Sequence, residues 1–174
     1  KERFGTSWLV GDTLNIGIGQ GFSLATPLQL AVMTARIASG REVIPNLIRN
    51  TEKELDKMKA LSIRKETLAA IKKGMYDVVN EKKGTAFNFR STHENFLIAG
   101  KTGTSQVRRI TREERESGVI KNEDLPWKMR DHALFTCFAP YRSPKYALSV
   151  VVEHGGSGSK VAAPIARDIM LFQL

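Results

Sequence analysis

The spacing of apolar residues along the chain follows the helical period in three stretches, each of which predicts a helix with one apolar face. In the first stretch, Thr26 and Pro27 are a typical helix start, and Gly40 is a typical helix end. The second stretch is 65–80 and the third is 162–170, and both show apolar residues three or four positions apart. The sequence therefore predicts three helices, and each needs another element to cover its apolar face.

Three further stretches have the composition and length of β-strands, namely 96–104, 132–139 and 146–153. The turn 141–145, which contains Pro144, joins the last two. It is too short for a parallel crossover, which needs about a dozen residues or more. We therefore expect an α+β fold, in which an antiparallel sheet is flanked by helices.

The remaining segments lack a sustained period. The stretch 105–130 is long and charged, and it predicts an exposed loop or an extended hairpin arm. The stretch 12–22 is β-prone and punctuated by glycine, so we expect a tight turn or a close backbone approach there. Residues 43–48, interrupted by Pro45, predict a short extended piece, and 155–159 predict a flexible turn.

Composition narrows the class of protein. The 174 residues are enough for one domain with a core, and no apolar run is long enough to span a bilayer. The single cysteine, Cys137, lies within an apolar run and is expected to be a small buried hydrophobe. Lys and Arg outnumber Asp and Glu by 27 to 18, a net charge of +9 that favours anionic partners. Aromatic residues are not interleaved with the bases, so we expect no nucleic-acid partner.

The sharpest candidate for chemistry is Lys101-Thr102-Gly103-Thr104, at the end of a predicted strand. The lysine supplies a fixed cation, and the two threonine hydroxyls lie two residues apart, so they point to one face and can both grip a carboxylate. Gly103 carries no side chain, so a substrate backbone can approach and pair with the strand. The amide of Thr104 can donate to a developing oxyanion. The alternative for so short a motif is a surface strand end with ordinary turn residues.

The surroundings of this motif resemble the penicillin-recognising acyl-serine enzymes, in which Lys-Thr-Gly is one of three motifs. The ordered set of similar segments resembles class B penicillin-binding proteins, and the penicillin-binding protein 2 branch more than the septal branch. The segments that carry the resemblance are 16–21, 26–31, 99–105, Trp127, 131–133, 138–140, 151–156 and 162–166. The resemblance implies a partial serine β-lactamase-like transpeptidase fold, of which 1–174 would be the C-terminal portion.

The resemblance also implies an activity, that of a peptidoglycan D,D-transpeptidase. In such enzymes a serine attacks the D-Ala-D-Ala bond of a stem peptide, and an amine of a second stem then takes the acyl group; β-lactams acylate the same serine. Lys101 would orient the serine of a Ser-x-Asn motif, and Thr102 and Thr104 would bind the terminal carboxylate. The Thr104 amide would form half of the oxyanion hole, with Gly103 admitting the substrate backbone.

The setting that the resemblance implies is the periplasmic face of the bacterial inner membrane, with an anchor outside this chain. A glycosyltransferase and the elongation machinery would be the partners of the full protein, and neither a cofactor nor a metal is expected.

The nucleophile is where the sequence departs from the family. No Ser-x-Asn occurs, and the family's Ser-x-x-Lys precedes the glycine-rich region at 17–21. The two Ser-x-x-Lys sequences present are 62–65 and 157–160. We expect Ser62 to cap the helix that follows, and we expect Ser159 to lie in a glycine-rich turn beside a solvated lysine. The catalytic serine is therefore expected outside this chain, and the chain alone is expected to be inactive.

Other candidate sites are weaker. His93, His132 and His154 do not show the spacing of metal ligands, although His132 at a strand start is placed to shape a cleft. The glycines at 17–21 lack the pattern of a nucleotide loop, which leaves a structural turn. A stand-alone, non-catalytic module that binds cell wall or another polyanion is the alternative function, supported by the net charge.

The family architecture carries one further expectation. There the first strand of the sheet comes from upstream and pairs with the last, here 146–153. Without that neighbour the strand would form an open edge, and open edges recruit other chains. We therefore expect either self-association through this edge or its closure by residues 1–11.

Overall fold

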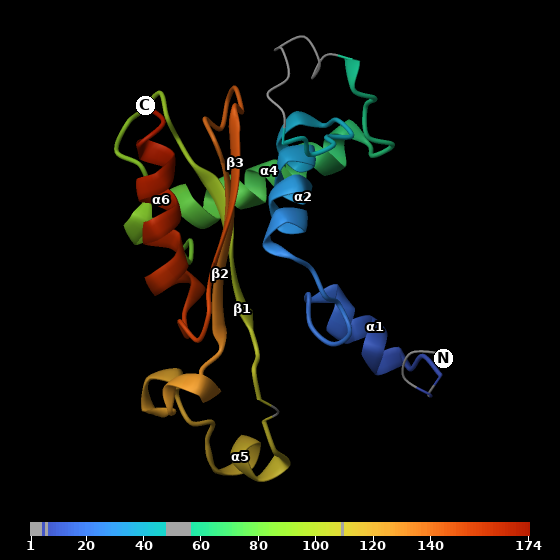
Figure 1. Ribbon diagram of the computed structural model, residues 1–174, viewed down its shortest axis with the longest axis vertical. Helices are drawn as coiled ribbons and strands as arrows, with labels where there is room; N and C mark the ends of the chain where they lie inside the picture. The colour runs from blue at the N-terminus through green and yellow to red at the C-terminus, as the bar shows by residue number, and fades with distance from the viewer. Residues whose placement is uncertain (1–4, 6, 48–56, 109) are drawn as a thin grey trace.

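The computed structural model describes residues 5, 7–47, 57–108 and 110–174 (Figure 1). Its helices and strands, in chain order, are α1 (Val10–Gly17), α2 (Pro27–Ser39), α4 (Lys65–Asn80), β1 (Ala99–Ser105), α5 (Arg112–Ser117), β2 (His132–Ala139), β3 (Tyr146–Val152) and α6 (Ala163–Leu171). Shorter helical turns are η1 (Phe87–Phe89), η2 (Asn122–Asp124), η3 (Trp127–Met129) and the π-helical η4 (Gly158–Ala162).

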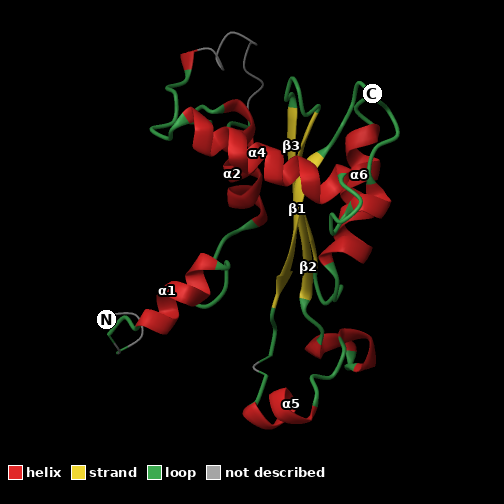
Figure 2. Cartoon of the chain, turned by 180° about the vertical axis from the view of Figure 1, so that it is seen from behind, coloured by secondary structure: helices red, strands yellow, loops and turns green. Residues whose placement is uncertain are grey.

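The three strands form one antiparallel sheet in the order β1-β2-β3, with β1 and β3 at its edges. Helix α6 covers one face of the sheet, and α2 lies against the other, with α4 crossing the end where β1 begins (Figures 1 and 2). Helices on both faces of an antiparallel sheet confirm the predicted α+β class.

Strand alternation divides the core between the two faces. On β2, Phe135 and Cys137 are buried in the same cluster as Ala166 and Met170 of α6. Phe138, which points to the opposite face, is buried in a second cluster with Ala38 of α2 and Met75 of α4. Because successive strand residues point to opposite faces, the central strand builds both cores.

The predicted helices at 27–39 and 65–80 are confirmed. Helix α2 begins with a capping box, in which the Thr26 hydroxyl accepts from the Gln29 amide and the Gln29 side chain accepts from the Thr26 amide. It ends at Gly40, whose φ of 70° is the left-handed conformation that glycine adopts without strain. The predicted cap by Ser62 is wrong, because α4 begins after Arg64 and no side chain caps it.

The expectation of an extended, β-prone segment at 12–22 is wrong in its first half. Residues Val10–Gly17 form helix α1, whose start is stabilised by the Asp12 carboxylate accepting from the Leu9 amide at 2.8 Å. None of the residues of α1 is buried, so the helix is stabilised by local capping and not by an apolar face packed against the core. The predicted tight turn follows it, where Gly19 and Gly21 adopt φ of 74° and 78°.

The arm between β1 and β2 is less irregular than predicted, because it contains α5 and two short helical turns. Thr111 caps α5, and one guanidinium nitrogen of Arg108 contacts both carboxylate oxygens of Glu114, at 2.7 and 2.9 Å. The hydrogen bond from the Thr111 amide and the Arg108 guanidinium together lower the pKa of the Glu114 carboxyl. Local hydrogen bonds therefore order this arm, while its apolar periodicity is weak.

The structure also tests the expectations for the segments 43–48, 155–159 and 1–11. The described portion of 43–48 forms no strand, and an isolated bridge joins Arg41 to Ala60 instead; Ile48 itself lies outside the described residues. The predicted turn at 155–159 gives way to η4 at Gly158. No strand forms in the described part of 1–11, and β3 has no second strand beside it among the described residues.

Candidate active-site strand

Strand β1 carries Lys101-Thr102-Gly103-Thr104 out of the core and along one edge of the sheet. Its first residues, Ala99 and Gly100, are buried, whereas Lys101 and Thr104 are exposed. The motif therefore has one end anchored in packed side chains and the other open to a ligand.

The backbone of Thr104 faces the open edge of β1. The carbonyl oxygens of Thr102 and Thr104 accept from the side chains of Lys101 (2.8 Å) and Gln20 (3.2 Å), so both carbonyls point away from β2. In an antiparallel strand the N–H and C=O of one residue point to the same side. The Thr104 amide consequently points toward the edge where an incoming carbonyl oxygen would lie.

The two threonine side chains share one face of the sheet, as their spacing predicted. Thr102 and Thr104 are opposite Phe135 and Ala133, which belong to the α6-facing core. The Thr102 hydroxyl also lies 3.0 Å from the hydroxyl of Thr85, which follows α4. The loop after α4 therefore fixes one of the two hydroxyls that the motif offers.

Lys101 is the cation of the motif. Its ammonium group donates to the Thr102 carbonyl, and within the described part of the chain it forms no ion pair. An exposed ammonium group held against the open edge is a fixed positive charge available to an anionic ligand.

Glycines determine how closely other elements approach the motif strand. A Cβ on Gly158 would lie 2.4 Å from the carbonyl oxygens of Gly103 and Leu134, so η4 packs directly on the backbone of β1 and β2. A Cβ on Gly100 would lie 2.5 Å from the Phe135 ring. These positions need glycine because the neighbouring atoms are backbone or buried ring atoms.

One of the two Ser-x-x-Lys sequences ends at the first residue of α4, and the other spans the start of η4. Ser62 is exposed in a bend before α4. Ser157 caps η4 by accepting from the Lys160 amide at 3.3 Å, and its hydroxyl lies 3.2 Å from that of Ser159. Lys160 is exposed, as the sequence predicted.

A histidine pair lies at the end of β2 and β3, and sequence analysis did not find it. The His154 amide donates to Nδ1 of His132 at 2.9 Å, and the two rings lie 4.7 Å apart. Trp127 contacts the His154 ring edge-on at 4.7 Å. His154 has a φ of 55°, unusual for a residue with a side chain, which turns it back toward β2. His132 follows Asp131 at the base of the arm, so the pair ties the arm to the sheet.

The described residues contain no cluster of three or more side chains able to hold a metal. Within the same residues, no helix has the length and apolar character needed to span a membrane.

Comparison with known proteins gives a family. Residues 1–171 match the penicillin binding protein transpeptidase domain. The peptidoglycan D,D-transpeptidase MrdA of Haemophilus influenzae is 36% identical over the whole chain, and that of Escherichia coli K12 is 32% identical over 98% of it. The chain spans about 27% of the length of each of these curated relatives.

Solved structures agree with the sequence matches. Penicillin-binding protein 2 of Helicobacter pylori, in a complex with MreC, is 36% identical with a TM-score of 0.76, covering 99% of this chain and 29% of that one. PBP2 of Pseudomonas aeruginosa is 35% identical with a TM-score of 0.71, covering 97% and 35%. The chain belongs to the penicillin-binding protein transpeptidase family, and it matches the C-terminal part of the peptidoglycan D,D-transpeptidases of the PBP2 (MrdA) branch.

Proposed function

We propose that this segment supplies the substrate-binding strand of a peptidoglycan D,D-transpeptidase that works through an acyl-serine. The observation that carries the proposal is the open edge of β1, where the Thr104 backbone and the Lys101 ammonium group face outward. A stem peptide that pairs with this edge as an added strand gains backbone hydrogen bonds and meets a cation.

Each motif residue has a role in this proposal. The Lys101 ammonium group holds the hydroxyl of a Ser-x-Asn serine and makes the site positive, which favours an anionic substrate. The hydroxyls of Thr102 and Thr104 bind the terminal carboxylate of the stem peptide, or the acid group of a β-lactam. The Thr104 amide stabilises the oxyanion that forms when the serine attacks the carbonyl carbon. Gly103 leaves room for the substrate backbone.

The reaction has two steps. The serine oxygen bonds to the carbonyl carbon of the penultimate D-alanine, the peptide bond breaks, and the leaving amine of terminal D-alanine takes the proton. The amine of a second stem then attacks the ester, releases the serine and closes the crosslink.

We further propose that neither Ser62 nor the serines at 157–159 is the nucleophile, so that residues 1–174 alone are inactive. The exposed bend at Ser62 and the capping role of Ser157 support this assignment, because a nucleophile needs its lysine within hydrogen-bonding reach.

The cellular setting is part of the same proposal. The full protein would act at the periplasmic face of the inner membrane, with a glycosyltransferase and the elongation machinery as partners and β-lactams as inhibitors. The Helicobacter pylori relative forms a complex with MreC, which supports a protein partner for the full enzyme.

Acylation by a fluorescent penicillin, followed by intact mass analysis, tests the proposal. The purified chain should give no adduct. A chimera in which 1–171 replaces the matching segment of the Haemophilus influenzae relative should be acylated at the serine of that relative. Lys101→Ala in the chimera should slow acylation at least 100-fold, and Lys128→Ala, at an exposed lysine of the arm outside the motif strand, should not. A folded chimera that is not acylated would contradict the proposed role of the segment in the transpeptidase. A stoichiometric adduct on the isolated chain would contradict its proposed inactivity.

A further inference from the structure

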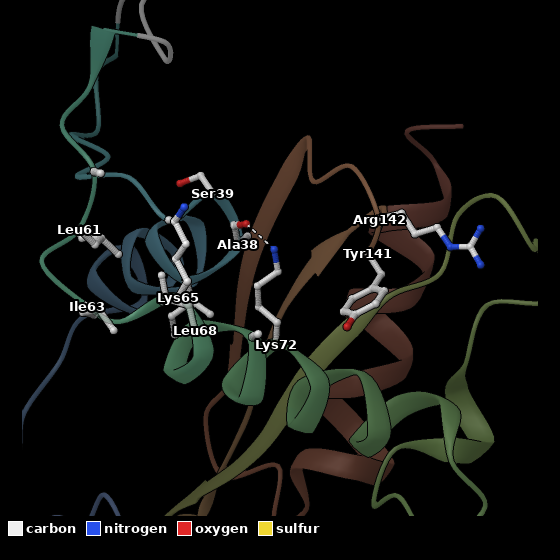
Figure 3. A pocket seen from close by; sticks show the side chains of 13 residues that line it. Ala38, Ser39, Leu61, Ile63, Lys65, Leu68, Lys72, Tyr141 and Arg142 are labelled. Atoms are coloured by element: carbon white, nitrogen blue, oxygen red, sulfur yellow. Dashed lines mark hydrogen bonds between the residues drawn. The ribbon is translucent and has the colours of Figure 1, made fainter.

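A cavity of about 620 Å³ lies between the end of α2, the first half of α4 and the residues that follow β2 (Figure 3). Its size is within the range of ligand-binding pockets, roughly 300–1,000 Å³. It adjoins the end of the sheet where β1 begins, whereas Thr104 lies near the other end of that strand. The cavity is therefore a separate feature from the motif strand.

One face of α4 forms the floor of this cavity. Lys65, Leu68, Ala69 and Lys72 all line it, and their spacing of three, four and seven residues places them on a single stripe. Lys65 and Lys72 rise from the same side of α4, with Leu68 between them (Figure 3). Seven residues of helix advance about 10.5 Å, so the backbone positions of the two lysines lie about that far apart along α4, on either side of an apolar centre.

The charge of the lining has one sign. Among the described residues that line the cavity, three are cations, Lys65, Lys72 and Arg142, and none is a carboxylate. Within the described part of the chain none of these three forms an ion pair. The Lys72 ammonium group donates to the Ala38 carbonyl at 3.0 Å, which holds it over the cavity and satisfies a carbonyl at the end of α2. An anionic ligand therefore meets cations and no carboxylate among the described lining residues.

We propose that this cavity binds an extended acidic segment of a partner protein, in which two carboxylates three residues apart flank an apolar side chain. Such a segment in the polyproline II conformation has three residues per turn and advances about 3.1 Å per residue, so residues three apart lie on one face about 9 Å from each other and match the spacing of the two lysines along α4. The apolar side chain of the segment lies against Leu61, Ile63 and Leu68. The inference does not depend on the acyl-transfer function, because it uses none of the motif residues.

Fluorescence anisotropy with a labelled peptide, Gly-Ser-Glu-Leu-Ala-Glu-Ser-Gly, measures this interaction on the whole chain. The double variant K65E/K72E should weaken binding at least tenfold. The matched control K82E/K83E changes the net charge equally at exposed lysines outside the cavity, and it should weaken binding less than twofold. Replacing the leucine of the peptide by serine should weaken binding to the unaltered chain at least fivefold.

Several outcomes would overturn the proposal. Equal weakening by the two double variants would mean attraction to the net charge alone, and undetectable binding of the peptide at millimolar concentration would exclude the site. Binding to phosphatidylserine vesicles that is lost in K65E/K72E, with no binding of the peptide, would assign the cavity to a membrane surface. K65E alone, at an exposed residue, should retain the circular dichroism of the parent chain and still weaken binding at least threefold.

Discussion

The contact of Gly158 with the motif strand makes a quantitative prediction about the substitution Gly158→Ala. An added Cβ would lie 2.4 Å from the carbonyl oxygens of Gly103 and Leu134, and 3.1 Å from the Gly103 nitrogen. All three are backbone atoms within paired strands, so no side-chain rotation relieves the overlap. Either η4 moves away from the sheet or the two strands distort.

Overpacking of a well-packed interior costs about 1–3 kcal/mol, and contact with two fixed carbonyls puts Gly158 at the upper end. Alanine recovers about 0.4–1 kcal/mol, because it restricts the unfolded chain. The expected net loss in the free energy of unfolding is about 2 kcal/mol. For a chain of this size that loss lowers the Tm by about 4–8 °C.

Urea denaturation followed by circular dichroism measures this loss, and Gly74→Ala is its matched control. Gly74 lies in α4, and an added Cβ there meets no atom within 4 Å, so alanine should stabilise the chain by about 0.5–1 kcal/mol. The two identical substitutions thus have opposite expected signs. A Gly158→Ala variant as stable as the parent, at an unchanged m-value, would refute the close packing of η4 on the strands.

Three further predictions concern other parts of the molecule. Burial raises the pKa of the Cys137 thiol to about 12. Its bound proton therefore stabilises the folded chain fully below about pH 9, and this stabilisation is lost as the pH rises toward 12. In unfolding measured against pH, the variant Cys137→Ala should lack this pH-dependent contribution. Buried Thr34 and half-buried Thr136 share a hydrogen bond between their hydroxyls, so Thr34→Val should cost about 1 kcal/mol, and a double-mutant cycle with Thr136→Val should show coupling of about 0.5 kcal/mol or more. The open edge of β3 should cause self-association at high concentration, and a clean monomer in analytical ultracentrifugation would contradict this expectation.

The parts of the fold that the sequence predicted are those with strong local signals. Helix α2 has its capping box at Thr26 and a left-handed Gly40, and both are visible as residue types. Strand β2 is a largely apolar run between Asp131 and Pro140, and its predicted limits agree with the structure. Helix α1 was missed because it buries none of its residues and therefore has no core-facing apolar stripe. Its start is formed in part by a hydrogen bond from the Leu9 amide to the Asp12 carboxylate.

In the candidate site, too, the sequence predicted the contiguous motif but not the contacts between distant residues. The motif at 101–104 is contiguous, so its residue types made it a candidate, and the family resemblance of the surrounding segments distinguished it from an ordinary strand end. Its contacts with Gln20 and Thr85 join residues 84 and 17 positions apart, and no local pattern encodes them. The pairing of His132 with His154 depends on the register of β2 with β3 and on the left-handed backbone of His154, which residue types alone do not determine.

The hydrogen bond between Gln20 and the Thr104 carbonyl has a consequence for any chain that adds to the open edge. A ligand N–H that approaches this carbonyl from the side of the Gln20 carboxamide displaces it, so the glutamine competes with such a ligand. Displacement frees the glycine turn at 19–21 from its tether to the sheet. Occupancy of the edge and the position of this turn are therefore thermodynamically linked, and whatever pulls the turn away raises the affinity of the strand for its ligand.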